Sequence, residues 1–121
     1  MRRETKLFKA LSDPNRIRII KMLQERELCV CEIADILNLA YSTVSKHLAV
    51  LRDTEMILDR KAGKWVNYRL NPDAGDEQVR ELLALVQQWL NDDATVRTDR
   101  AAVRSVDRDI ICNITPKKEN T

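Results

Sequence analysis

The sequence predicts a single, mainly α domain of the α+β class, in which one β-hairpin follows a series of short helices. Two observations predict this class. Apolar residues recur at helical spacing through most of the chain, and one stretch near its middle alternates instead around a glycine turn. The length of 121 residues fits one hydrophobic core.

The first helices are predicted from their apolar stripes and from one start signal. Leu7 and Leu11 lie at helical spacing, and the polar residues before Pro14 form a cap with proline in the first helical position. A second helix therefore begins near Pro14. Its apolar stripe includes Ile19 and Leu23, and it should end before residues 25–27.

Two further short helices follow with a turn between them. The spacing of Ile33 and Leu37 predicts a third helix over about residues 31–37, and residues 38–41 break the period. Ser42 then fits the N-cap of a fourth helix whose inward side carries Val44 and Leu48. Two short helices joined in this way form a helix-turn-helix.

A β-hairpin is predicted directly after the fourth helix. Residues 57–61 and 64–70 are joined by Ala62 and Gly63, and apolar residues alternate along the second segment. A hairpin in this place is the wing of a winged helix-turn-helix.

A long apolar face is predicted on a helix that begins near Asp76. This face either closes the core of one chain or packs against the matching helix of a second copy, and we expect a homodimer formed through the terminal helices. Residues 1–92 would then be the winged DNA-binding and dimerisation domain. Residues 93–121 would be a partly flexible C-terminal extension with a weak further helix ending near Cys112.

Composition excludes several classes of protein. No segment approaches the about 20 consecutive apolar residues of a membrane span, and the first residues do not resemble a secretion signal, so we expect a cytoplasmic protein. Three cysteines are an odd number, which predicts reduced thiols. An enzyme is not expected, because the sequence has no Cys-x-x-Cys and no phosphate-binding glycine loop.

Positive charge gathers at the fourth helix and the wing. Residues 42–69 contain six Lys or Arg against three acids, although the whole chain has a net charge of only +2. Hydroxyls and cations at the start of such a helix donate to phosphates and base edges, and wing cations follow the neighbouring backbone. The alternative is a capped, solvated surface helix. The predicted DNA contacts are Ser42, Thr43, Ser45, Lys46, His47, Arg52, Arg60, Lys61 and Lys64.

The cysteine pair Cys29 and Cys31 is a candidate site for a soft ion, because thiolates select such ions over hard ones. The two sulfurs converge only where the chain is extended. A helix start there should lower a thiol pKa. The alternative is that both cysteines are small buried apolar residues. A three-sulfur site would need Cys112, from the same chain or from a partner, unless Cys112 is a bystander.

Several of these segments resemble the ArsR/SmtB family of winged-helix metalloregulators, in particular its arsenical-resistance repressors. Residues 11–17 look like the family's opening helix junction, residues 42–52 like its recognition helix, and residues 58–70 like its wing. Residues 27–32 resemble its inducer box. The resemblance implies a homodimer on an inverted repeat of double-stranded DNA, released by As(III) or Sb(III), with no cofactor needed for DNA binding.

One departure from the family pattern bears on the inducer. The best-known arsenic box has a third cysteine three residues after the second, where this chain has Ala34. The resemblance therefore implies either a two-thiolate site or recruitment of Cys112. The cadmium and lead branch adds cysteines from an N-terminal extension, which this chain is not expected to have. The zinc branch uses Asp and His ligands on the long helix, and residues 76–93 contain acids but no histidine, so arsenic is favoured. A cadmium or lead sensor, or a thiol redox-sensing repressor of the same fold, is the alternative.

Overall fold

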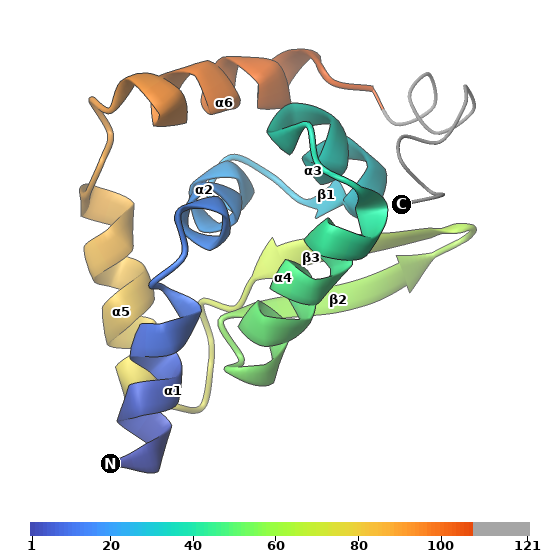
Figure 1. The fold of residues 1–121 in the computed structure, drawn as a ribbon. Helices are drawn as coiled ribbons and strands as arrows, with labels where there is room; N and C mark the ends of the chain where they lie inside the picture. Colours follow the sequence, from blue (N-terminus) through green and yellow to red (C-terminus); the bar gives the residue numbers. More distant parts are fainter. Residues whose placement is uncertain (108–121) are drawn as a thin grey trace.

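The computed structural model describes residues 1–107 as six helices and one small sheet (Figure 1), and it contains the predicted helix-turn-helix followed by a hairpin. The helices are α1 (Arg2–Ala10), α2 (Pro14–Leu23), α3 (Val30–Leu37), α4 (Tyr41–Asp53), α5 (Glu77–Gln88) and α6 (Ala94–Ser105). The strands are β1 (Leu28–Cys29), β2 (Ile57–Ala62) and β3 (Trp65–Leu70). No described helix is long and apolar enough to span a membrane.

The sheet is antiparallel in the order β1-β3-β2. The hairpin of β2 and β3 is the predicted wing, and it projects away from the helices (Figure 1). Strand β1 was not predicted, because two residues are too few to show alternation. It pairs with the middle of β3, with Cys29 opposite Asn67.

The core lies between α2, α3, α4 and α5. Ile19 and Ile20 of α2, Ile33 of α3 and Leu48 of α4 are inaccessible or nearly so. Asp13 starts α2 as predicted, since its carboxylate accepts from the N–H groups of Asn15 and Arg16. These contacts fix the orientation of the helix-turn-helix.

The predicted N-cap of the fourth helix is wrong. Helix α4 begins at Tyr41 with Ala40 as its N-cap, and no side chain caps it. Ser42 therefore lies inside the first turn, where its side chain is exposed. Asn38 ends α3 with φ of 56°, a left-handed conformation that asparagine tolerates well, and the short turn after it leaves little room for a separate cap.

Helix α5 is shorter than its apolar stripe. It starts after Asp76, as predicted, but ends at Gln88, and Leu90 has φ of 63°. Buried Lys21 of α2 holds this end by donating to the carbonyl of Val86 at 2.9 Å and to Asn91 Oδ1 at 3.0 Å. Burial lowers the pKa of Lys21, with a further contribution from the charge of Arg100.

Helix α6 lies across α2 and α3 (Figure 1). Its Asp99 is 3 % exposed and binds the guanidinium of Arg18 through both carboxylate oxygens, at 2.8 and 2.9 Å. Val96 and Val103 are buried on the same side. The sequence predicts a weak helix through Val103, Val106 and Ile110 to near Cys112, but α6 begins earlier and ends at Ser105, and Val106 is extended. Ile110 and Cys112 lie outside the described residues.

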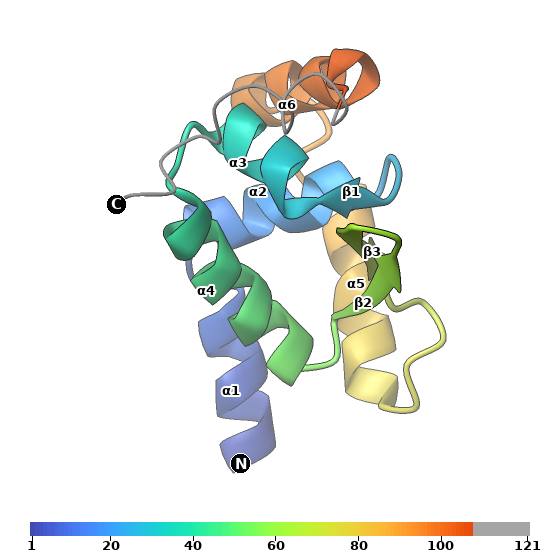
Figure 2. The ribbon, with the colours of Figure 1, turned by 90° about the vertical axis from the view of Figure 1, so that its right-hand side faces the viewer.

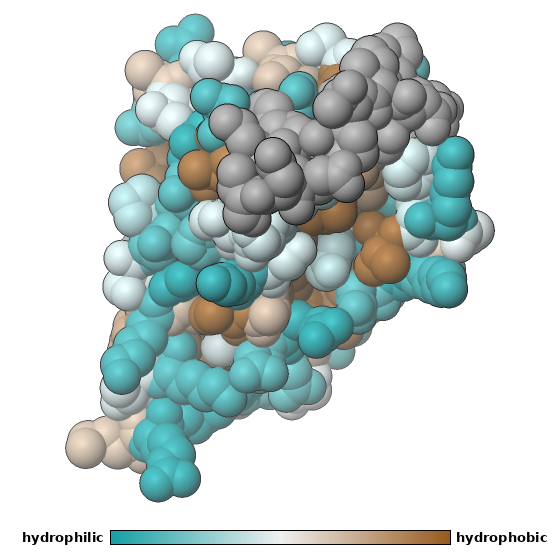
Figure 3. Space-filling view, turned by 45° about the vertical axis from the view of Figure 1, so that its right-hand side comes forward, coloured by the Kyte–Doolittle hydropathy of each residue, from teal (hydrophilic) through white to brown (hydrophobic). Residues whose placement is uncertain are grey.

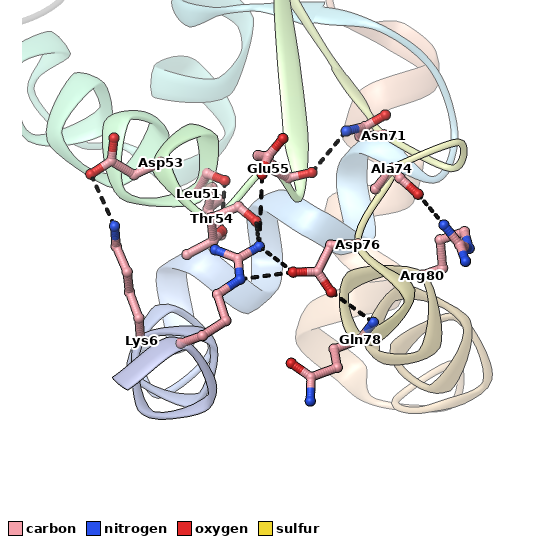
Figure 4. A network of polar contacts seen from close by, with 11 residues as sticks. Lys6, Leu51, Asp53, Thr54, Glu55, Asn71, Ala74, Asp76, Gln78 and Arg80 are labelled. Atoms are coloured by element: carbon pink, nitrogen blue, oxygen red, sulfur yellow. Dashed lines mark hydrogen bonds and ion pairs between the residues drawn. The ribbon is translucent and has the colours of Figure 1, made fainter. Parts of the chain in front are cut away.

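A polar network joins the N-terminal helix to the end of α4 and the start of α5 (Figure 4). The guanidinium of Arg3 lies 2.8 Å from Asp76, the N-cap of α5, and donates to the carbonyl of Thr54 at 3.1 Å. The hydrogen bond from Arg3 is the main reason that the pKa of Asp76 is lowered. Lys6 of α1 also approaches Asp53 at 3.8 Å.

Candidate functional site

Helices α3 and α4 pack against each other and leave one face of α4 open. Val44, Leu48 and Leu51 are buried on its inner side. Four of the predicted contact residues share its exposed side: Ser42, Thr43, Ser45 and Lys46. Hydrophilic side chains cover most of the surface around α4 and the wing (Figure 3). The arrangement presents hydroxyls and a cation on a protruding helix, as groove-reading helices do.

His47 differs from its neighbours on α4. It is half-buried, and its Nδ1 lies 3.2 Å from Nη1 of Arg16, at the start of α2. One of its two ring nitrogens is therefore engaged within the protein.

The wing presents two lysines beside its turn. Gly63 has φ of +63°, a left-handed conformation that suits glycine in a tight turn. Lys61 and Lys64 are exposed on either side, and Nζ of Lys64 lies 5.0 Å from the centre of the Trp65 ring. These cations can follow a phosphate backbone.

The two arginines of the predicted interface are held by acids. Arg52 at the end of α4 binds Asp59 of β2 at 2.8 Å, and Arg60 binds Glu27 at 2.6 Å. The first pair joins the wing to α4, and the second joins it to the segment before β1. Sequence reasoning missed both acids, because their partners are distant in the chain or separated by a turn.

Cys29 lies where the wing meets α3. It is the last residue of β1, faces Asn67 of β3, and is also the extended N-cap of α3. Cys31 lies in the first helical turn, so the extended backbone that would make the two sulfurs converge is present at Cys29 and not at Cys31. Its side chain accepts from the N–H of Glu32, while its own N–H donates to the Glu32 carboxylate at 2.9 Å. Cys29 thus takes the place of serine or threonine in a capping box.

The two cysteines differ in state and exposure. Cys29 is a free thiol and 1 % exposed. Cys31, in the first turn of α3, is 9 % exposed and is disulfide-bonded in this structure, which differs from the reduced thiol that the sequence predicts. Cys112 lies outside the described residues. Within residues 1–107 no cluster of three or more His, Cys, Asp or Glu could hold a metal ion.

The expectation that the helix start lowers the thiol pKa is wrong for Cys29. Burial raises the pKa of Cys29, and the charge of Glu32 adds to this effect. The N–H groups of Glu32 and Cys31 favour the thiolate, but they do not overcome burial. The thiol in this state is therefore protected from reaction.

Arg26 connects this thiol site to the end of α6. Its Nη2 lies 3.2 Å from the Glu32 carboxylate and donates to the carbonyls of Val103 and Val106 at 2.9 and 3.2 Å. A polar cavity of about 540 Å³ opens here. It is lined by Arg26, Glu27, Glu32, Asn67, Arg104, Ser105, Val106 and Asp107. Sequence reasoning missed both Glu32 and Arg26. The three-residue spacing from Cys29 to Glu32 could have revealed Glu32 as part of a capping box, whereas nothing in the sequence indicates Arg26.

Together, the exposed helix of a helix-turn-helix and a basic hairpin tip define a winged-helix DNA-binding protein of the transcription-regulator class. The sequence model of the family described as "Bacterial regulatory protein, arsR family" matches residues 13–57. The chain is 42 % identical over 110 residues to the arsenic resistance transcriptional regulator ArsR2 of Pseudomonas putida, and the match covers 88 % of this chain and 94 % of the relative. The chain belongs to the arsR family of bacterial regulatory proteins.

Two other similarities agree with this assignment. The arsenical resistance operon repressor of Escherichia coli is 49 % identical over 67 residues, which cover 54 % of this chain and 57 % of that repressor. Among solved structures, reduced HlyU from Vibrio cholerae superposes with a TM-score of 0.59 at 32 % identity, over 69 % of this chain and 84 % of that one. The winged-helix fold expected from the sequence is confirmed.

Proposed function

We propose that this regulator represses an arsenic-resistance operon. It binds an inverted-repeat operator as a homodimer, without a cofactor, and releases it when As(III) or Sb(III) binds its cysteine thiolates. The observation that carries the proposal is the position of Cys29 at the junction of β1, the wing and α3. Relatives named for arsenic resistance support the choice of inducer.

The position of Cys29 gives a physical route from the thiols to the DNA-reading elements. Cys29 faces Asn67 of β3, and Asn67 faces Arg60 of β2, so the three residues form one row across the sheet. Cys29 also caps α3, which packs against α4. A displacement of Cys29 therefore acts on the wing and on the recognition helix together.

Ion binding must disturb the start of α3. The sulfur of Cys29 is buried and accepts the N–H of Glu32, and a sulfur bonded to arsenic would leave that N–H without its partner. Ligation by both Cys29 and Cys31 would then unwind the first turn of α3. Moving a two-state population from 1:99 to 99:1 needs about 5.5 kcal/mol of differential affinity, which two or three strong As–S bonds can supply.

The end of α6 favours Cys112 of the same chain as a third ligand. Arg26 joins Val106 to Glu32, so the described chain ends close to the thiol site. Cys112 follows Asp107 by five residues, a segment that spans up to roughly 17 Å when extended. Recruitment of Cys112 would supply the third sulfur that a pyramidal arsenite complex prefers.

The homodimer is proposed on the apolar surface of α1 and α5. A groove between these helices is lined by Glu4, Leu7, Phe8, Gln78, Glu81 and Leu82. Phe8 is 65 % exposed and Leu85 of α5 is 46 % exposed, although both are large apolar residues. A second copy that covers this surface would place two recognition helices in a two-fold arrangement, as an inverted repeat requires.

An operator-release titration tests the proposal. Fluorescence anisotropy of labelled operator is followed at fixed salt under strong reductant, which keeps Cys31 a thiol, while arsenite, antimonite, cadmium and zinc are added in turn. We expect release by arsenite and antimonite and little effect of zinc. Release by cadmium alone, or only after the reductant is replaced by an oxidant, would support the alternative sensors instead.

Cysteine variants locate the inducer site in the same titration. Cys29→Ser and Cys31→Ser should keep operator affinity but lose release by arsenite. A Cys112→Ser variant decides the number of ligands: a weaker response means a three-sulfur site, and an unchanged response means a two-thiolate site. Normal arsenite release by both Cys29→Ser and Cys31→Ser would refute the site.

A further inference from the structure

The side chain of Arg16 connects three parts of the chain that meet beside the recognition helix. Its Nε donates to the carbonyl of Ala10 at 2.7 Å, and its Nη2 donates to the carbonyl of Lys9 at 3.0 Å. Both carbonyls belong to the last turn of α1, and that of Lys9 also accepts from the backbone N–H of Ser12 at 3.1 Å and from its hydroxyl at 2.7 Å. The remaining branch, Nη1, lies 3.2 Å from Nδ1 of His47 on α4.

The contact with Arg16 selects one tautomer of the neutral His47 ring. A guanidinium carries only donors, so Nδ1 must be the acceptor and the ring proton must be on Nε2. His47 is the only histidine of the chain, which makes this state directly measurable.

Arg16 is itself held firmly. Its backbone N–H donates to the carboxylate of Asp13 at 3.2 Å, as does the N–H of Asn15 at 2.8 Å. Burial of Asp13 opposes its ionisation, but these N–H groups, with the nearby charge of Arg16, lower its pKa overall. The backbone of Arg16 is therefore held in place at the beginning of α2, and its guanidinium group extends from this position.

We propose that Arg16 is a positioning residue for DNA recognition, which fixes the rotation of α4 by holding His47 through Nδ1. The inference rests on the DNA-binding function of the family and not on the proposed inducer. Apolar contacts of Val44 and Leu48 bury the inner side of α4, but such contacts are not directional. The hydrogen bond from Arg16 is directional, and it sets which residues face the groove.

Two substitutions of His47 separate positioning from direct contact with DNA. In His47→Asn the side-chain oxygen takes the place of Nδ1, whereas in His47→Gln it lies one bond further, near the place of Nε2. We expect Asn to keep operator affinity within about threefold and Gln to lose about tenfold, with little change in affinity for random DNA. Helix propensity favours Gln, so it cannot produce this order. A Gln variant equal to or better than Asn would overturn the proposal.

A spectroscopic measurement on the native sequence, free of affinity tags, tests the same claim without any variant of His47. Long-range ¹H–¹⁵N correlation at neutral pH should show one imidazole with its proton on Nε2, and Arg16→Lys should convert it to a mixture of tautomers. A proton on Nδ1, or a mixture in the native chain, would contradict the proposal. Failure of the native chain to bind any operator would instead count against the proposed function.

Discussion

At the scale of single residues, burial decides the chemistry of Cys29. The sequence places this thiol at a helix start, where the backbone N–H groups favour a thiolate, but it cannot show that the side chain is 1 % exposed and lies beside a carboxylate. Both of these features raise the pKa of Cys29. Reaction with a soft ion therefore requires the start of α3 to open first.

The raised pKa of Cys29 predicts a loss of stability at alkaline pH. Above the ordinary thiol pKa of about 8.5, the unfolded chain loses a proton that the folded chain keeps. The contribution of Cys29 to the free energy of unfolding is thus full below that pH and falls as the pH rises. Urea unfolding under reductant should show that wild type and Cys29→Ala become closer in stability from about pH 7.5 to about pH 10. A constant difference would mean that the thiol is not shielded.

The cations of the wing and of α4 show a further limit of prediction from the sequence alone. Lys61, Lys64, Arg52 and Arg60 are equivalent cations in the sequence, but the structure pairs Arg52 with Asp59 at 2.8 Å and Arg60 with Glu27 at 2.6 Å. Each of these ion pairs joins β2 to another segment, either α4 or the residue before β1. Local sequence patterns do not reveal which segments lie next to β2.

The difference between these cations predicts unequal contributions to DNA affinity. Lys61→Gln should reduce the slope of log affinity against log salt by about one unit, because one phosphate contact is lost. Arg60→Gln, the matched control, should change the slope less, because Glu27 already neutralises Arg60. Anisotropy titrations at several salt concentrations measure both slopes. Equal reductions would show that Arg60 leaves Glu27 to bind DNA.

At the scale of elements, the sequence predicts the helices and strands that have a strong apolar periodicity or a clear capping or turn residue. The residues around Pro14 and Gly63 locate the start of α2 and the turn of the wing. The sequence does not reveal β1, which has two residues, or the true start of α4, where no side chain caps the helix. In both places tertiary packing determines the backbone, and local chemistry gives no indication of it.

Helix α6 is an example of an element that depends on tertiary contacts. Its own apolar stripe is weak, but buried Asp99 is held by Arg18 of α2, and Arg26 binds its last carbonyls. We infer that α6 connects the thiol site with the rest of the fold.

Breaking the ion pair between Arg18 and Asp99 should release α6. Asp99→Asn is expected to lower the free energy of unfolding by about 2 kcal/mol, because a half-buried guanidinium loses its carboxylate. Hydrogen exchange over residues 94–105 should also become faster. The control Arg104→Gln removes the ion pair with Glu25, in which the Arg104 side chain is 72 % exposed. The free energy of unfolding should then change by less than about 0.5 kcal/mol. Similar changes in both variants would contradict this role of Asp99.

At the scale of the whole molecule, the proposed binding of an inverted repeat requires two copies of the chain. The sequence predicts a helix with more apolar surface than one core needs, and the structure leaves Phe8, Leu85 and Trp89 exposed. Arg3 links the same region to the end of α4 through the carbonyl of Thr54. Arg3 therefore connects the helices of the proposed dimer surface with the end of the recognition helix.

A charge placed on the proposed dimer surface should separate the two copies. Leu85→Glu is expected to sediment as a monomer at concentrations where wild type is a dimer, and to lose at least about tenfold in operator affinity while its helical content stays the same. Ala101→Glu puts the same charge on the exposed face of α6 and should change neither property. A Leu85→Glu variant that remains dimeric would place the interface elsewhere.

The proposed function requires that the thiols and the DNA-reading elements are energetically coupled, and such coupling must be reciprocal. Arsenite affinity is measured under reductant from thiolate–arsenic absorbance, once for the free protein and once with saturating operator. If arsenite weakens operator binding by some factor, operator must weaken arsenite binding by the same factor, which we expect to lie in the range of about 5 to 150. Equal arsenite affinity with and without operator would show that the two sites are independent.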